Sequence, residues 1–117
     1  MNTPVRVDAA QIERALVNLL ENALEFSPHA VEISIERAPG EVVVLVSDRG
    51  PGIAEGERER IFEPFARGKS SGGSGLGLAI ARGFVQANAG RLWVEPRGDG
   101  TTFLLALPAA PFPARVP

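Results

Sequence analysis

Two asparagines in the first third of the chain have the spacing of a ligand pair. Asn18 and Asn22 are four residues apart, so on a helix both carboxamides project from the same face. The oxygen of an amide such as that of Asn22 is a suitable ligand for a hard cation such as Mg²⁺. The polar face of a surface helix also carries asparagines that bind nothing, so this pair alone leaves both interpretations open.

An acidic residue follows the most apolar run of the sequence. Asp48 comes directly after residues 42–46, which read Val-Val-Val-Leu-Val, and it precedes Gly50 and Gly52. A carboxylate at the end of a buried strand needs hydrogen-bond donors, and the exocyclic amine of adenine is one such donor. The two glycines would let the backbone approach a planar base closely. The alternative is a simple Asx turn, in which the carboxylate accepts from a nearby backbone N–H.

A glycine-rich run opens the second predicted helix. Residues 73–78 read Gly-Ser-Gly-Leu-Gly-Leu, and exposed N–H groups at a helix start attract anions such as phosphates. A flexible hinge is the alternative. Three familiar motifs are excluded by single residues: Glu63 stands where a P-loop needs glycine, Glu55 where a dinucleotide fingerprint needs it, and Leu76 where a nucleophile elbow needs it.

The composition excludes several classes of protein. The 117 residues include no cysteine and one histidine, His29, so disulfides, thiolate catalysis, zinc ribbons and iron–sulfur clusters are ruled out. The net charge of −2 is unlike that of a general nucleic-acid or anionic-membrane binder. We therefore expect neither nucleic acid nor direct membrane contact among the partners of this chain.

The hydrophobic pattern predicts an α/β two-layer sandwich, with a mixed, mostly antiparallel sheet and helices on one face. A helix over 9–26 should begin at an Asp8 N-cap, with Leu24 in its apolar half. The strand at 31–36 should have one solvent-exposed face. The helix at 75–89 should be followed by Gly90 in the left-handed C′ position. The other predicted elements are a short helix at 55–60, strands at 42–46, 91–95 and 101–107, and a fraying proline-rich tail at 109–117 after a domain at 1–108.

Five motifs taken together resemble one family, the ATP-binding catalytic domain of bacterial sensor histidine kinases. This family belongs to the superfamily shared with gyrase, the Hsp90 chaperones and MutL, and known as GHKL or HATPase. The resemblance extends in the family's order over nearly the whole chain, and residues 65–68 look most like the KdpD type. The matching motifs are the N box at 18–23, the first glycine box at 48–53, the F box at 61–65, the second glycine box at 73–78 and the glycine–threonine motif at 98–103.

The resemblance implies a Bergerat-type fold that binds ATP with Mg²⁺. Asn22 would ligate the metal with Asn18 in support, and these two with Arg67 would form the catalytic set. Asp48 would accept from the adenine amine, and Thr101 would lie at the adenine end. The other implied nucleotide contacts are Gly50, Gly52 and Ile53 at the base, Phe65, Lys69 and Gly73 in or beside the lid, and Gly75, Leu76 and Gly77 at the phosphates.

The resemblance also implies a reaction. The γ-phosphoryl group of Mg–ATP would pass to a histidine on a separate helical-hairpin domain of the parent protein, and the parent would signal to a response regulator. Because His29 is in no such hairpin, the acceptor is expected outside this chain, in the cytoplasmic portion of a sensor. Three alternatives remain: an anti-sigma-factor-type serine kinase, a non-catalytic nucleotide sensor, and an ATPase clamp. The clamp is disfavoured because Asn18 stands where those enzymes place a glutamate base.

Overall fold

The computed structural model describes residues 5–27, 30–65, 75–97 and 100–110. The predicted lid segment at 66–74, the centre of the turn at 98–100, His29 and the tail beyond residue 110 lie outside these residues. Neither α-helix in the described part of the chain is long and apolar enough to cross a membrane.

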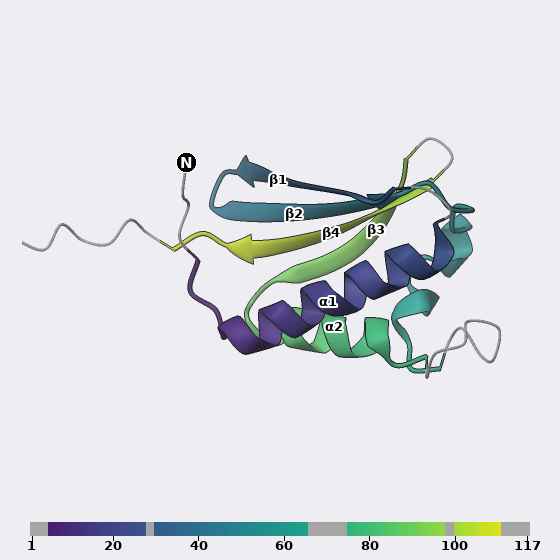
Figure 1. Ribbon diagram of the computed structural model, residues 1–117. Helices are drawn as coiled ribbons and strands as arrows, with labels where there is room; N and C mark the ends of the chain where they lie inside the picture. The colour runs from purple at the N-terminus through teal and green to yellow at the C-terminus, as the bar shows by residue number, and fades with distance from the viewer. Residues whose placement is uncertain (1–4, 28–29, 66–74, 98–99, 111–117) are drawn as a thin grey trace, which may run out of the picture.

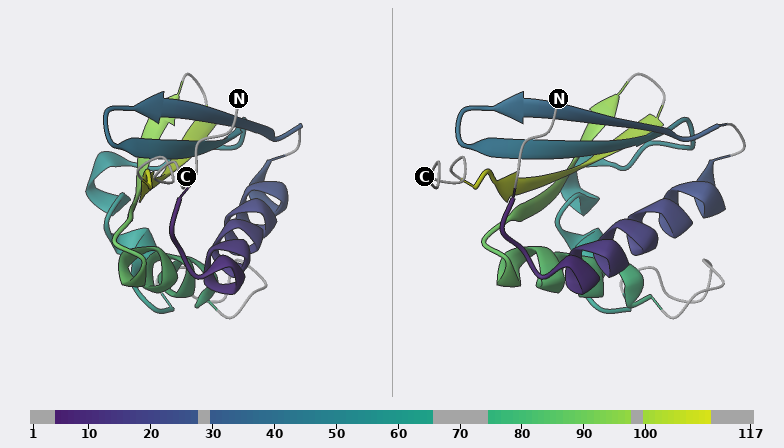
Figure 2. Two further views of the ribbon diagram at one scale, coloured as in Figure 1. Left: turned by 90° about the vertical axis from the view of Figure 1, so that its left-hand side faces the viewer. Right: turned by 60° about the vertical axis from the view of Figure 1, so that its left-hand side comes forward.

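The described chain forms two layers, a sheet and a pair of helices on one of its faces (Figures 1 and 2). The four strands lie in the order β1-β2-β4-β3, and each neighbouring pair is antiparallel. This arrangement confirms the predicted two-layer fold with a mostly antiparallel sheet. The elements are α1 (Ala9–Phe26), β1 (Glu32–Ala38), β2 (Glu41–Asp48), the 3₁₀ turns η1 (Glu55–Glu57) and η2 (Arg60–Phe62), α2 (Gly77–Ala87), β3 (Arg91–Arg97) and β4 (Gly100–Pro108).

Helix α1 begins as the sequence predicts but buries a narrower face. The Asp8 carboxylate accepts from the backbone N–H of Gln11 at 3.1 Å, which satisfies one of the free donors of the first turn. Its buried residues are Ile12, Ala15, Leu19 and Ala23. The placement of Leu24 in the buried half was wrong, since this side chain is 63% exposed.

The sheet buries apolar side chains on both of its faces. Alternate residues of β2 and β4 face the helices, and these include Val46, Phe103 and Leu105. The intervening residues form a second cluster on the outer face, made of Val43, Leu45, Leu104 and Ala106 with Trp93 packed against it. The Arg91 guanidinium stacks 4.5 Å from the Trp93 ring and pairs with Glu41 at 2.9 Å. Long side chains of this kind explain how the run at 42–46 is shielded where no helix covers it.

The end of α2 differs from its prediction because a side chain fixes it. Asn88 is the C-cap; it donates to the Phe84 carbonyl at 2.8 Å and to Gln11 Oε1 at 3.0 Å. Its own Oδ1 accepts from the backbone N–H of Asp8 at 2.7 Å, which joins the helix ends. Ala89, with φ of 62°, therefore takes the left-handed position expected of Gly90. Gly90 is needed for another reason, because a Cβ there would lie 2.5 Å from the Ala106 carbonyl oxygen.

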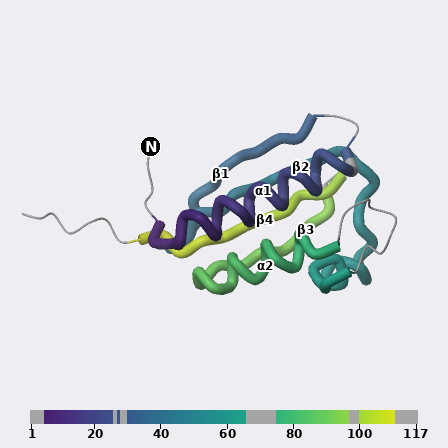
Figure 3. Tube along the Cα trace, turned by 60° about the horizontal axis from the view of Figure 1, so that its bottom comes forward, coloured from purple at the N-terminus to yellow at the C-terminus, as the bar shows by residue number. Residues whose placement is uncertain are grey.

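Three further details of the predicted elements were wrong. The short helix expected at 55–60 is a pair of 3₁₀ turns, and α2 begins at Gly77 rather than residue 75. In addition, β1 is exposed on both faces, although one wet face was expected. Helix α1 packs over β2 and helix α2 over β3, so β1 lies beyond the helical layer (Figure 3).

Candidate functional site

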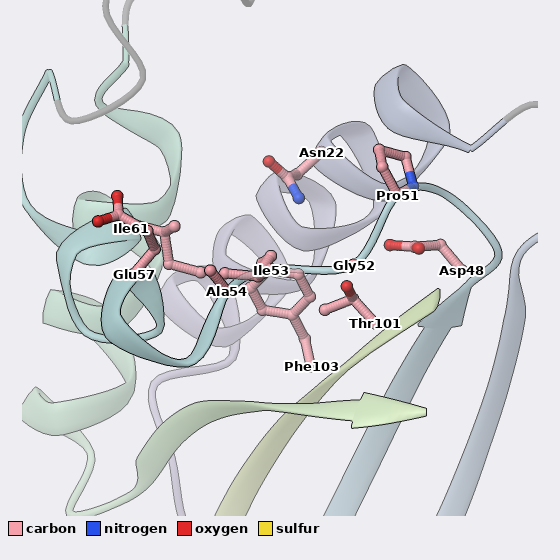
Figure 4. Close-up of a pocket in the computed structure, with 10 residues that line it drawn as sticks. All are labelled: Asn22, Asp48, Pro51, Gly52, Ile53, Ala54, Glu57, Ile61, Thr101 and Phe103. Carbon is pink, nitrogen blue, oxygen red and sulfur yellow. The ribbon is translucent and has the colours of Figure 1, made fainter. Parts of the chain in front are cut away.

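A cavity of about 350 Å³ opens beside the end of β2 and the start of β4, next to the last turns of α1 (Figure 4). Its volume lies in the range of sites that bind small ligands. The strands supply Asp48, Thr101 and Phe103, and α1 supplies Asn22. The rest of the lining comes from the segment after β2, namely Pro51, Gly52, Ile53, Ala54, Glu57 and Ile61.

Asp48 is the buried acidic group of this cavity. It ends β2 directly opposite Thr101 of β4, and only 9% of the residue is exposed. The backbone N–H of Gly50 donates to Oδ1 of Asp48 at 2.9 Å, which is the Asx turn considered as the alternative. This bond occupies one carboxylate oxygen, and the carboxylate points into the cavity (Figure 4). The turn and a ligand-binding role are therefore compatible, because a second acceptor oxygen remains.

Close backbone contact forms the floor behind Asp48. A Cβ at Gly100 would overlap the carbonyl oxygen of Asp48 and lie 2.9 Å from Cα of Arg49, so β4 can start here only at a glycine. Gly52 faces the same strand, with its Cβ position 3.8 Å from the Gly100 carbonyl oxygen. The cavity next to Asp48 thus has backbone walls that leave room for a flat ligand.

Aromatic packing supports the opposite side of the cavity. Phe103 lines it and meets Phe62 of η2 edge to face, with ring centroids 6.1 Å apart. The Arg82 guanidinium lies 4.6 Å from the centroid of the Phe62 ring and pairs with Glu59 at 3.0 Å. These contacts attach the segment around Glu59 and Phe62, which precedes the predicted lid, to helix α2, which follows the lid.

The two asparagines of α1 have different surroundings. Asn22 lines the cavity, and its amide points toward the space in front of Asp48 (Figure 4). Asn18 donates from Nδ2 to the carbonyl of Gly77 at 3.1 Å and so connects α1 to the start of α2. Asn18 lines a separate groove between the two helices, together with residues such as Arg14, Ile80 and Phe84.

The glycine-rich run is described only from Gly75 onward. The Gly75 carbonyl accepts from the backbone N–H of Phe65 at 2.8 Å, and both residues have positive φ, 78° and 64°. Leu76 is the N-cap of α2 and Gly77 its first residue, and Gly77 lines the groove that contains Asn18 rather than the cavity at Asp48. Phe65 is 65% exposed and does not line the cavity. Arg67, Lys69 and Gly73 lie outside the described residues.

Five lining residues were not singled out from the sequence, namely Pro51, Ala54, Glu57, Ile61 and Phe103. Ala54 and Glu57 lie in the segment that joins the first glycine box to the F box, whereas Pro51, Ile61 and Phe103 lie inside matched motifs but were given no role there. Phe103 could have been found from its register, because it is two residues after Thr101 and so faces the same side of β4. Glu57 carries a second carboxylate of the cavity, and it pairs with Arg60 at 3.3 Å.

The comparison of sequences identifies related proteins. Residues 7–111 match the family described as histidine kinase-, DNA gyrase B-, and HSP90-like ATPase. Sensor-like histidine kinase SenX3 of Mycolicibacterium smegmatis is 41% identical over 115 residues, which cover 91% of this chain and 30% of that protein. Sensor protein KdpD of Rathayibacter rathayi is 43% identical over 112 residues, covering 92% of this chain and 13% of that protein. Identity therefore does not separate the KdpD type from the others.

Solved structures show the same fold. Full-length ShkA in complex with AMPPNP has a TM-score of 0.83 at 31% identity, covering 98% of this chain and 25% of that one. Histidine kinase ThkA in complex with the response regulator protein TrrA has a TM-score of 0.77 at 32% identity, covering 91% of this chain and 30% of that one. The chain spans less than a third of the curated SenX3 proteins that it matches.

Proposed function

This chain belongs to the family of histidine kinase-, DNA gyrase B- and HSP90-like ATPases, and from that premise we propose that it binds Mg–ATP and donates the γ-phosphoryl group to a histidine on a separate helical domain. One observation carries the proposal: a single cavity is lined both by the buried carboxylate of Asp48 and by the Asn22 amide of α1 (Figure 4). The first suits an adenine amine and the second a metal on the phosphates.

The base would bind between Asp48 and the backbone of the first glycine box. The oxygen of Asp48 that is not engaged by Gly50 would accept from the exocyclic amine, and Thr101 of β4 lies directly opposite Asp48. Ile53 and Phe103 supply apolar surface for the ring. In support of this assignment, the solved structure of ShkA is a complex with the ATP analogue AMPPNP.

Asn22 fits a metal that takes most of its ligands from the nucleotide. Among the described residues no group of three acidic, histidine or cysteine side chains could hold a metal ion. Mg²⁺ commonly binds through few protein oxygens together with substrate phosphates, so one amide oxygen is a sufficient protein share. Asn22 would hold the metal beside the nucleotide, where Mg²⁺ would supply positive charge to the phosphates. Arg67 and Lys69 are proposed to add positive charge from the lid.

The acceptor is proposed to be an imidazole rather than water. Asn18 has no basic atom, and its amide is engaged by Gly77, so it cannot activate a water molecule. Neutral imidazole is nucleophilic near neutral pH and needs little help from a base. ThkA was solved with a response regulator, and we propose that a response regulator is likewise the final partner of the parent of this chain. The site would then work in the cytoplasmic portion of a sensor.

The test of the function uses ATP labelled at the γ-phosphate with the chain alone, the helical-hairpin domain of its parent alone, and both together. Label is expected on the hairpin only in the mixture, and it should be acid-labile, as phosphohistidine is. The chain alone should release phosphate very slowly. Rapid release by the chain alone would instead support the ATPase clamp, and acid-stable label on serine would support the anti-sigma kinase. ATP binding without any transfer would support the nucleotide sensor.

Substituting the buried carboxylate should weaken nucleotide binding. In Asp48→Asn the carboxylate becomes an amide, which loses the charge and can present a donor to the adenine amine. We expect Mg–ATP binding to lose about 1.5–3 kcal/mol, the range for a hydrogen bond to a charged group. Titration calorimetry measures this loss. Asp8→Asn is the matched control, because asparagine also caps helices and Asp8 lies outside the cavity. Equal affinity of Asp48→Asn and wild type would contradict the adenine assignment.

A further inference from the structure

Within the described residues, the first strand of the sheet has an open edge and an uncovered apolar row. In the sheet order β1-β2-β4-β3, β1 is an edge strand whose partner is β2. Ile33 and Ile35 face the helical layer, because they lie opposite Val46 and Val44 of β2. They are nevertheless 55% and 67% exposed, since β1 lies beyond α1. Exposed apolar residues gathered in one place usually mark an interaction site.

Helix α1 also has an exposed leucine, on the side that lies away from α2. Leu16, Leu20 and Leu24 follow one another at four-residue spacing, and the first two pack against the core. Leu24 is 63% exposed. It lies about 120° around the helix from Asn18, which contacts α2, so Leu24 points away from the helix pair. We call Leu20, Leu24, Ile33 and Ile35 the β1 flank.

The other face of β1 carries an acidic row. Glu32, Ser34 and Glu36 alternate with the isoleucines and are all exposed. Their paired residues on β2 are Ser47, Leu45 and Val43, so no basic residue of β2 lies opposite either glutamate. Within the described residues neither glutamate forms an ion pair. The open edge is therefore apolar on one face and negatively charged on the other.

We propose that the edge of β1 is a docking site for an extended polypeptide segment from outside this chain, in which apolar and basic residues alternate. Such a segment would add a fifth strand and pair with the free backbone groups of β1. Its apolar side chains would continue the row of Ile33 and Ile35 over the β1 flank. Its lysines or arginines would lie beside Glu32 and Glu36, where cross-strand pairs of opposite charge are favourable.

Charge distinguishes this occupant from a second copy of the chain. In the antiparallel register that places Ile33 opposite Ile35 of another copy, Glu32 lies opposite Glu36. Two-fold symmetry repeats this like-charge pair, and like charges directly opposite each other destabilise a sheet. A basic segment makes attractive contacts at the same two positions. In this register the glutamates thus oppose pairing with a second copy, while they favour a basic strand.

The experiment titrates the chain with three synthetic peptides of equal length. One alternates lysine and valine, one alternates glutamate and valine, and the third is the lysine peptide with a central proline. Binding is measured by fluorescence anisotropy and mapped by amide chemical shifts. We expect at least tenfold tighter binding of the lysine peptide than of the other two, with shifts concentrated on β1. Shifts concentrated elsewhere, or equal binding of the proline peptide, would overturn strand addition.

Variants separate the charge from the edge. Glu32→Lys combined with Glu36→Lys should reverse the preference, so that the glutamate peptide binds more tightly than the lysine peptide. Binding of the glutamate peptide also shows that the variant is folded. Ile35→Lys puts a charge in the apolar row and should abolish binding of the lysine peptide. The control, Glu55→Lys with Glu63→Lys, makes the same change in net charge away from the sheet and should keep the original preference. An unreversed preference in the first variant would overturn the proposal. So would a concentration-dependent dimer of the wild-type chain, detected by sedimentation, that Ile35→Lys abolishes.

Discussion

Asn22→Ala should abolish transfer of label from γ-labelled ATP to the helical-hairpin domain. The substitution removes the amide side chain that α1 contributes to the lining of the cavity, and with it the proposed metal ligand. Metal stabilisation of the charge on a transferring phosphoryl group contributes several kcal/mol, so we expect the initial rate to fall at least about 100-fold. The rate of label incorporation at saturating Mg–ATP measures the effect, and circular dichroism confirms that the variant is folded.

The dependence on Mg²⁺ separates loss of the ligand from a general disturbance. The wild-type chain should bind ATP more tightly with Mg²⁺ than with a chelator, whereas Asn22→Ala should bind it equally in both. Gln86→Ala is the matched control, because it truncates an exposed amide on α2 that does not line the cavity. An Asn22→Ala chain that retains both rapid transfer and Mg²⁺-dependent binding would show that the metal is held elsewhere.

Two of the predicted nucleotide-binding residues could be chosen from their side-chain chemistry alone. Asp48 and Asn22 could be selected from the sequence because a carboxylate after a buried run and an amide on a polar helical stripe need partners. The structure brings both to one cavity, with Gly52, Ile53 and Thr101. Apolar lining residues carry no such signal. Phe103 looks like any core phenylalanine until the register of β4 places it next to Thr101 on the same face.

The errors in the fold share a physical cause. Periodicity identifies the apolar half of a helix, but the width of the surface that covers it depends on packing with other elements. Leu24 is exposed because it lies on the side of α1 that points away from α2, where no described element covers it. In the same way, a glycine after a helix satisfies two different needs. Gly90 was assigned to a left-handed turn, yet it is required by its contact with the Ala106 carbonyl, which comes from a strand far along the chain.

Gly100 is the second position at which a single substitution should have a large effect. A Cβ at this residue would overlap the Asp48 carbonyl oxygen and lie 2.8 Å from its carbonyl carbon, and these are backbone atoms that cannot turn away as a side chain does. Gly100→Ala must therefore separate the start of β4 from the end of β2. Overpacking of this kind costs about 3 kcal/mol, and thermal unfolding should show a Tm lower by roughly 10 °C or more.

The same displacement should reach the cavity, because Asp48 and Thr101 form the strand pair next to Gly100. Nucleotide binding by Gly100→Ala is expected to weaken beyond what its lower stability explains, and calorimetry well below its Tm measures this. Gly83→Ala is the control, since a Cβ at that position in α2 meets no atom within 4 Å. Alanine is favoured over glycine inside a helix by about 1 kcal/mol, so this variant should be slightly more stable and bind normally. A Gly100→Ala variant with the Tm and the nucleotide affinity of the wild-type chain would show that the close approach of β4 to Asp48 does not shape the site.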